Sequence, residues 1–565
     1  MKLSNMYIFS HLGESRRGVR LLAASFLLFA GGVGGSLLMT SCSDTWDEHY
    51  DENRMPSDQT LLDLVSSDSE LSDFLKVLKS AHLYNNNHST PITYAELLGA
   101  DQSLTVWAPK NGTFDCDSLI KQCLTQQGDS MVGQHFLGNH IAHTLYTAET
   151  DAGKSVLMMN NKQVTGRLFD VIQDKSNQPA KNGLLHVVGQ EVPYNYNIYE
   201  GITSMSDFAH IGKFFKGFET HELDENASIQ RGIEDGMKVY SDSVMVKKNI
   251  LYNRFGLINH EDSCYFMLMP TAEVWDDVIK EAAPYFNYGS VLKADSISNY
   301  WMNSLLLQAS FYNRNIQTYM ADSIYSTWYS RMNPEYNVFY RPLDQGGVLS
   351  DEFVKDSLEC SNGMIYTLKK WPFTKEQLYF RPIEVEPEYS YTLLENKDCT
   401  FNYRQAVGDS VSSHGYLDIV PAKSTSNWTA KFRIENTLAG TYDICAIILP
   451  KTVYNPNSRD VKPNKFKATL TYTDLQGNSV KEDYPQGEGA PKELENNPYC
   501  VDTVVIGRVS LPVCNYAQNI VTVNLQINCS IANRETKFSR EMFLDCIYFR
   551  PVTDEKSPVY SSKKR

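Results

Sequence analysis

Three segments in the last third of the chain alternate apolar and polar residues with a period of two. They cover residues 428–435, 466–473 and 521–528. Successive side chains of a β-strand point to opposite faces, so this period predicts strands with one buried and one solvated face. With the apolar runs 444–449 and 543–552 beside them, we expect an all-β antiparallel sandwich, jelly-roll-like, over about residues 387–556.

The segment 60–83 has a different period. Its apolar residues recur at helical spacing, with Ser72 and Asp73 in the middle as a point where a second helix can begin. Two β-prone runs follow, LTVWAPKNGTF from Leu104 and NGLLHVVGQEVP from Asn182. This part of the chain thus combines helices with short buried strands, and an Asn-Gly turn begins the second strand.

A fainter copy of both runs occurs further along the chain, as expected of an internal repeat. CYFMLMPTAEVW begins at Cys264 and SNGMIYTL begins at Ser361, with the helix-prone segment 298–312 between them. The copy indicates a second unit that repeats the two strand motifs.

These motifs resemble the signatures of the fasciclin domain, a compact α+β module of secreted and surface adhesion proteins. The resemblance implies an α+β fasciclin-like domain over residues 59–197 and a divergent one with insertions over residues 198–386, in which the matching residues have structural roles. In the first domain they are Pro109, Asn111, Phe114, His140, Asn182, Gly183 and His186. In the second they are Pro270, Thr271, Trp275, Asn362, Gly363 and Tyr366, with Ala272 in place of the motif's asparagine and Tyr366 in place of its histidine.

The N-terminus resembles a bacterial lipoprotein signal. Basic residues precede the apolar run 21–39, and Met39-Thr40-Ser41-Cys42 resembles the lipobox, after which cleavage leaves Cys42 to be lipidated, with palmitate among its acyl groups. A transmembrane anchor is the alternative, but four glycines within 31–35 weaken a spanning helix. We therefore expect a signal peptide at residues 1–41 and no fixed structure in the tail 557–565.

Acidic residues crowd the segment that follows Cys42, which we interpret as a tether at residues 42–58. It resembles the tethers that direct some lipoproteins to the outer face of the outer membrane, although a solvated linker has the same composition. We expect a lipid-anchored protein of the outer membrane that faces the cell exterior.

The charge and the cysteines limit the partners. The formal net charge is −15, which argues against a nucleic-acid partner. Ten cysteines follow Cys42 without metal-binding spacing, and the six from Cys399 onward are either disulfide-bonded or buried thiols. The only histidine cluster, at His135, His140 and His143, has no acidic residue or cysteine within it, so we expect packed histidines, no metal and no cofactor.

No motif of an enzyme class is present, and adjacent carboxylates in sequence do not establish the facing pair that glycoside hydrolysis needs. We therefore expect a non-catalytic surface protein for adhesion or binding, with a surface protein or a polysaccharide as its partner. The alternative is an accessory lipoprotein that captures glycans for a SusC/SusD-type, TonB-dependent outer-membrane transporter. For a glycan, the candidate contacts are the sandwich aromatics Tyr416 and Trp428, although Trp428 lies on the apolar face of its strand.

Overall fold

The computed structural model describes residues 58–560 except for gaps at 86–87, 149–154, 166–168, 227, 235, 291–294, 314–322, 328–337, 341–346, 406–410, 518–520, 555–556 and 558. The expected signal peptide, Cys42 and nearly all of the acidic tether lie outside the described residues. Within them, no helix is both long enough and apolar enough to cross a membrane.

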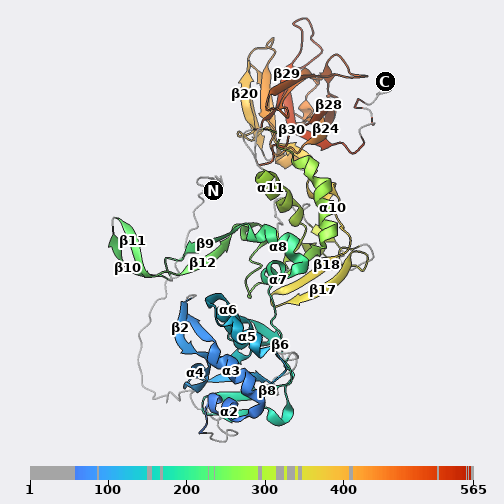
Figure 1. Ribbon diagram of the computed structural model, residues 1–565. Helices are drawn as coiled ribbons and strands as arrows, with labels where there is room; N and C mark the ends of the chain where they lie inside the picture. The colour runs from blue at the N-terminus through green and yellow to red at the C-terminus, as the bar shows by residue number, and fades with distance from the viewer. Residues whose placement is uncertain are drawn as a thin grey trace, which may run out of the picture. The chain divides into compact units, whose positions relative to one another are not determined.

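The first α+β unit is built on a four-stranded sheet with the order β4-β3-β8-β7 (Figure 1). The central strands β3 (Leu104–Pro109) and β8 (Gly183–Val188) are parallel, and every residue of β3 is buried, as in strands covered on both faces. The remaining elements are β4 (Ile141–Ala142), β7 (Gln178–Ala180), the hairpins β1–β2 (His82–Asn85, His88–Thr93) and β5–β6 (Ser155–Leu157, Gln163–Thr165), and the helices α2 (Leu61–Ser67), α3 (Ser72–Ser80), α4 (Tyr94–Gly99), α5 (Cys116–Gln122) and α6 (Gln126–Met131).

The second unit repeats this sheet in the order β14-β13-β18-β17. Its parallel central strands, β13 (Tyr265–Pro270) and β18 (Gly363–Leu368), lie at the two repeated motifs. The other elements of its core are β14 (Phe311–Asn313), β17 (Val354–Cys360), α7 (Ile198–Ser204), α8 (Ala209–Lys216), α9 (Tyr252–Phe255), α10 (Ala272–Ala282), α11 (Asp295–Leu307) and α12 (Lys375–Leu378). Three short ladders lie outside the core sheet: β9 (Glu219–Leu223) with β12 (Met245–Asn249), β10 (Ile229–Glu234) with β11 (Met237–Asp242), and β15 (Ser323–Tyr325) with β16 (Val338–Tyr340).

A glycine begins the second central strand of each sheet. Gly183 and Gly363 have φ values of 154° and 151°, and a Cβ on either would lie 1.9 or 1.8 Å from a backbone carbonyl oxygen of the neighbouring strand. Only a residue without a side chain fits there, because backbone cannot move away as a flexible side chain can. This explains physically why both motifs contain Asn-Gly.

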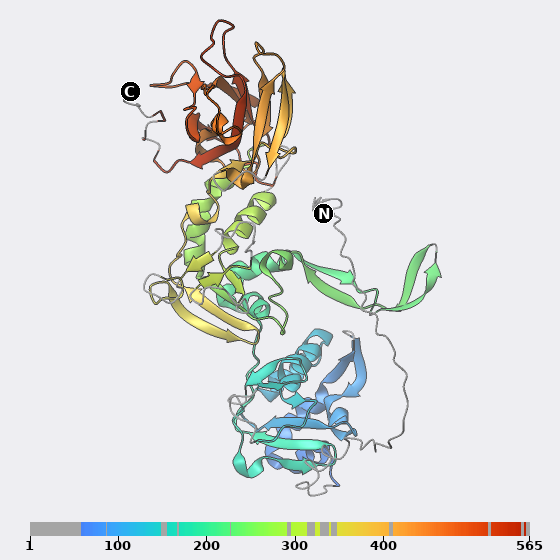
Figure 2. The ribbon, with the colours of Figure 1, turned by 180° about the vertical axis from the view of Figure 1, so that it is seen from behind.

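The third region consists of two antiparallel sheets (Figure 2). One contains β21 (Cys399–Gln405), β22 (Gly415–Pro421), β30 (Met542–Pro551), β24 (Gly440–Ile448) and β28 (Asp502–Leu511), with β19 (Ile383–Val385) also paired to β30. The other contains β20 (Leu393–Lys397), β23 (Thr429–Arg433), β29 (Val523–Cys529), β25 (Lys465–Thr473) and β26 (Ser479–Tyr484), with β27 (Leu494–Glu495) paired to β25. Buried residues of both sheets belong to one hydrophobic cluster, in which Phe432 and Ile547 are fully buried.

The structure changes two of the expected boundaries. The boundary expected at residue 387 places β19 in the second unit, but β19 pairs with β30, so the sandwich begins before residue 387. The expected disordered tail is also anchored in part, because the Tyr560 hydroxyl donates to the Ile506 carbonyl at 2.8 Å and Arg508 donates to the Ser557 carbonyl at 2.9 Å.

Candidate binding cleft

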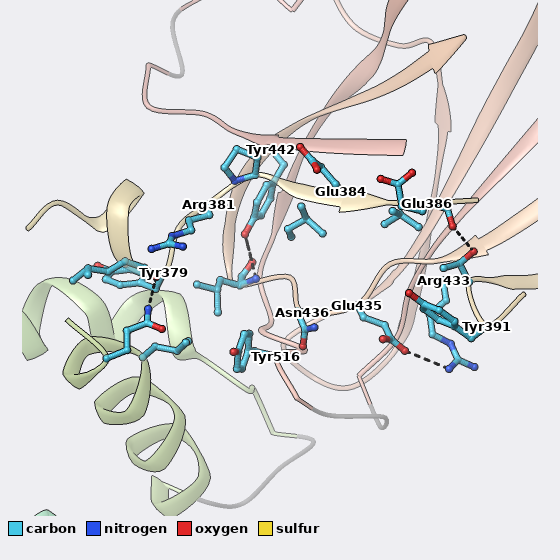
Figure 3. Close-up of a pocket in the computed structure, with 18 residues that line it drawn as sticks. Tyr379, Arg381, Glu384, Glu386, Tyr391, Arg433, Glu435, Asn436, Tyr442 and Tyr516 are labelled. Carbon is cyan, nitrogen blue, oxygen red and sulfur yellow. Dashed lines mark hydrogen bonds and ion pairs between the residues drawn. The ribbon is translucent and has the colours of Figure 1, made fainter. Parts of the chain in front are cut away.

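A cleft of about 510 Å³ lies where β19 and the segment after it meet the end of β23 (Figure 3). This volume lies within the usual range of small-molecule pockets, roughly 300–1,000 Å³. Residues from α11 and from the end of α12 contribute to it as well. Apolar side chains form part of the lining: Leu305, Leu378, Ile383, Val385 and Leu438.

The two sides of the cleft come from segments that are distant in sequence: β19 with the segment after it, and the end of β23. Strand β19 pairs with β30 and directs the chain into the segment that carries Glu386 and Tyr391. That segment joins the end of β23 through the Arg433 N–H, which donates to the Thr392 carbonyl at 2.7 Å. In Figure 3, Glu384 and Glu386 lie across the cleft from Glu435 and Asn436.

Two tyrosines stand at one end of the cleft. The ring of Tyr391 lines the cleft and is 66 % exposed, and it stacks on Tyr389 with 5.7 Å between ring centroids and 16° between ring planes. A ring backed by another ring is held in place and offers its free face to a ligand. Such a flat apolar face suits the apolar faces of a sugar.

The other end carries an arginine. Arg381 donates to the Gln377 carbonyl, and Figure 3 shows it beside Tyr379, away from Tyr391. The second arginine of the lining, Arg433, is paired with Glu435 at 3.4 Å. The guanidinium groups of Arg381 and Arg433 therefore lie in different parts of the cleft.

Glu386 presents a carboxylate with only one oxygen engaged. Its Oε1 accepts hydrogen bonds from the hydroxyls of Ser412 and Ser413, whereas its Oε2 is buried and has no hydrogen-bond partner among the described residues. Buried polar atoms are nearly always paired with protein, water or a ligand. Glu386 thus combines a place in the lining of the cleft with a buried acceptor that has no donor among the described residues.

Two more carboxylates are buried behind Glu386. Glu388 and Asp545 are 5 % and 3 % exposed, and the Asp545 Oδ1 accepts from the Ser412 N–H at 3.0 Å. Burial, reinforced by the neighbouring acidic charges, raises the pKa of Glu388 to about 7 and that of Asp545 to about 6. The pKa of Glu386 is also raised, mainly by burial. Glu386, Glu388 and Asp545 are thus partly desolvated carboxyl groups that lie close enough together to raise one another's pKa.

The motif residues of the first unit hold its elements together. Asn111 accepts a hydrogen bond from the Asp73 N–H at 2.9 Å and donates to the Ser69 carbonyl at 2.9 Å, so it fixes the start of α3. Pro109 is the last residue of β3, and the ring of Phe114 lies 5.0 Å from that of Phe136. None of these three lines the cleft.

The histidines of the first unit do not converge on a common site. His140 is fully buried, its Nδ1 donates to the Phe136 carbonyl at 2.7 Å, and burial lowers its pKa to about 4. His186 donates through Nε2 to the Tyr146 carbonyl, and burial lowers its pKa as well. His135 stacks on Tyr194 with 4.0 Å between ring centroids, while His143 contacts Gln102.

The motif residues of the second unit have comparable positions. Pro270 ends β13, the Thr271 hydroxyl caps α10 by accepting from the Val274 N–H, and Trp275 packs edge-on against Trp371. Tyr366 pairs with Leu268 in the same register in which His186 pairs with Trp107. Asn362 lies in the turn before β18, and Gly363 is the first residue of that strand.

The structure contradicts the prediction that Tyr416 and Trp428 contact a glycan. Tyr416 and Trp428 are each 1 % exposed, so neither offers a ring face to a sugar. Tyr416 packs against Phe543, and the Trp428 indole N–H donates to the Arg540 carbonyl at 2.6 Å. Both side chains belong to the packing of the sandwich.

Tyr391 and Glu386 could not be singled out from the sequence, because they lie at the expected domain boundary. The segment 386–392 (EPEYSYT) contains two tyrosines within two residues of each other and no strand alternation. Aromatic residues in a loop that does not contribute to the core were the one sequence signal that could have indicated a binding site here.

The cysteines and the acidic residues show no metal or disulfide arrangement in the described part of the chain. All ten cysteines from Cys116 to Cys546 are free, and of the six from Cys399 onward only Cys500 is exposed. Their thiols are thus mostly buried, which was one of the two expectations. Across the described ranges, no three His, Cys, Asp or Glu side chains form a group that could hold a metal ion.

Comparisons with known proteins give weak matches. No protein-family profile matches the chain, and no curated protein matches it. Among solved structures, a FAS1 domain pair from the insect cell adhesion molecule fasciclin I aligns at 12 % identity with a TM-score of 0.20, over 49 % of this chain and 90 % of that one.

Two further matches are to parts of carbohydrate-active enzymes. The CBM22-1–GH10 modules of Clostridium thermocellum xylanase 10B, complexed with xylohexaose, align at 11 % identity and a TM-score of 0.18, over 31 % of this chain and 26 % of that one. A Paenibacillus xanthan lyase aligns at 10 % identity and a TM-score of 0.20, over 43 % and 21 %. This chain spans about a quarter or less of either enzyme, and the fold described above rests on its own strand pairing.

Proposed function

We propose that this protein is a non-catalytic, lipid-anchored binding protein of the outer cell surface that recognises a glycan through the cleft beside β19. One observation carries the proposal: a cleft of small-molecule size that combines an exposed, ring-backed Tyr391 with an unpaired buried acceptor on Glu386. Rings that stack on sugars and polar groups that bond their hydroxyls are the two elements of a carbohydrate site. The lipid anchor rests on Cys42 and its preceding residues.

Binding is tested first with the full mature chain in detergent on an array of oligosaccharides. We expect a set of glycans to bind, and we expect Tyr391→Ala to weaken that binding about tenfold, which corresponds to about 1.4 kcal/mol. Tyr499→Ala is the matched control, because Tyr499 is 78 % exposed but does not line the cleft. Equal affinities for the two variants would place the glycan elsewhere, and turnover of any glycan would contradict the non-catalytic role.

The partner and the location are tested in cells. Cys42→Ser is expected to release the protein from the membrane fraction, and protease treatment of intact cells is expected to digest the unaltered protein. A crosslinked pull-down from intact outer membranes then distinguishes the two roles: a transporter barrel among the partners supports uptake, whereas a surface protein without a barrel supports adhesion.

A further inference from the structure

The lining of the cleft comes from two parts of the molecule. Leu305 lies in α11 and Gln308 directly follows that helix, while Leu378 ends α12 and Tyr379 follows it. These residues belong to the second α+β unit. The rest of the lining, which includes Tyr391, belongs to the sandwich (Figure 3). Both parts are therefore needed to form the cleft.

The two parts are joined by backbone hydrogen bonds as well as by their cores. The short helix η7 (Ala283–Phe286) and the residue after it bond to separate segments of the sandwich. The Ala439 N–H donates to the Tyr285 carbonyl at 2.9 Å, and the Cys514 N–H donates to the Asn287 carbonyl at 2.7 Å. Buried residues of the second unit and of the sandwich also belong to one hydrophobic cluster. An apolar junction of this kind restrains relative motion, so the two parts of the lining keep their spacing.

The second unit contributes an aromatic ring to the lining, that of Tyr379. This side chain is half-buried, and Figure 3 shows it at the opposite end of the cleft from Tyr391. Its ring packs against the rings of Tyr285 and Phe286, with 5.5 and 5.6 Å between the ring centroids. Tyr379 is thus held by other rings, as Tyr391 is held by Tyr389. Each end of the cleft has one ring that its neighbours keep in place.

Polar groups line the cleft between these two rings. In the view of Figure 3, Asn436 and Tyr516 lie between Tyr379 and Tyr391. Asn436 has a φ of 59°, in the left-handed region that asparagine adopts more readily than most residues, and its Oδ1 accepts from the Ala517 N–H at 3.0 Å. Its Nδ2 and the Tyr516 hydroxyl form no hydrogen bond within the described part of the chain. An amide N–H and a phenol can both bond to the hydroxyls of a ligand.

We propose that the cleft is a composite site, in which Tyr379 of the second α+β unit and Tyr391 of the sandwich contact different units of one oligosaccharide. This inference rests on the proposed glycan binding and names its substrate class, a chain of several sugar units. Once one ring holds the ligand, the contact with the other ring forms within the same complex and costs less. The affinity should therefore rise with ligand length until both rings are contacted, and then level off.

The first experiment measures affinity against ligand length with the full mature chain. The probes are fragments of one to six units prepared from each glycan that the array retains. We expect the affinity to rise at least about tenfold between one unit and the length that reaches both rings. Equal affinities for one unit and for six would overturn the inference, and this result depends on no variant.

The second experiment assigns the gain in affinity to the second α+β unit. Tyr379→Ala is expected to weaken the binding of six-unit fragments at least about tenfold and to leave single units within about twofold. Tyr379→Phe keeps the ring and should keep the length dependence. Tyr499→Ala, an exposed tyrosine outside the cleft, is the matched control. Circular dichroism checks that each variant is folded, because Tyr379 also packs against Tyr285 and Phe286.

Three outcomes separate the inference from the proposed function. A length dependence that is present in the unaltered protein and lost in Tyr379→Ala supports both. A length dependence that Tyr379→Ala keeps in full, with binding still weakened by Tyr391→Ala, overturns the inference while the proposed function stands. If the array retains no glycan, the proposed function is overturned and the inference with it.

Discussion

At the residue scale, the buried carboxylates make the stability of this protein depend on pH. The pKa of Glu388 is raised to about 7 and that of Asp545 to about 6, from ordinary values of 4.5 and 3.8. A raised carboxyl pKa means that folding favours the protonated form. The stabilisation is therefore complete below about pH 4 and is lost as the pH rises through about 6 to 7.

We expect the contribution of these groups to the free energy of unfolding to be about 1 to 2 kcal/mol smaller at pH 8 than at pH 5, after allowance for solvent screening. Urea unfolding at the two pH values, followed by hydrogen exchange in the strands of the sandwich, measures the difference. Glu388→Gln should flatten this dependence because it removes the group with the highest pKa, while Glu488→Gln should not. A variant that keeps the full slope would show that Glu388 is not its source.

At the element scale, one asparagine in each α+β unit connects the first helix to the turn before the second parallel strand. Asn182 accepts from the Leu61 N–H at 2.8 Å and donates to the Leu98 and Ala100 carbonyls. In the second unit, Asn362 accepts from the Ile198 N–H at 2.9 Å and donates to the Ile258 and His260 carbonyls. The same side chain thus makes the same three connections in both repeats.

Replacing either asparagine leaves buried backbone groups unpaired. We expect Asn182→Ala and Asn362→Ala each to destabilise their unit by about 2 to 4 kcal/mol. Hydrogen exchange should show faster exchange in α2 for the first variant and in α7 for the second, with Asn457→Ala, in an exposed loop, as the control. Unchanged protection of both helices would contradict this role.

At the scale of the whole molecule, a buried lysine joins side chains from both α+β units. Lys162 follows β5, its side chain is 4 % exposed, and its Nζ lies 2.7 Å from Glu200 and 2.5 Å from Glu261. It also donates to the Ser361 hydroxyl at 3.3 Å. A buried ammonium with two carboxylates is sensitive to the loss of one member, because the others are left uncompensated.

We expect Lys162→Met to lower the free energy of unfolding by about 3 kcal/mol and to accelerate limited proteolysis of the connecting segment 189–197. Lys181→Met is the control, since Lys181 forms only an exposed ion pair with Asp101. If the two variants were cleaved at the same rate, the Lys162 cluster would not restrain the connection.

The strands and turns could be predicted from local pattern, because period and turn chemistry depend on neighbours in sequence. The alternating segments 466–473 and 521–528 match β25 and β29 to within two residues at each end, and each Asn-Gly pair stands at the start of a parallel strand. The repeat of the α+β sheet also followed from its motifs. These features can be predicted without knowing which segments pack against each other.

The cleft could not be predicted, because it depends on which distant segments pair. Residues 383–385 read as the end of one domain, yet their hydrogen bonds go to β30, more than 160 residues later. That pairing carries Glu384 and Glu386 to the end of β23 and leaves Tyr391 exposed, while the packing of the sheets buries Tyr416 and Trp428. Local sequence patterns are therefore enough to predict the elements and their order, and they predict a lipid attachment at Cys42. Which aromatic rings stay free for a ligand depends on the tertiary structure, because burial is a property of pairing and packing between segments far apart in the chain.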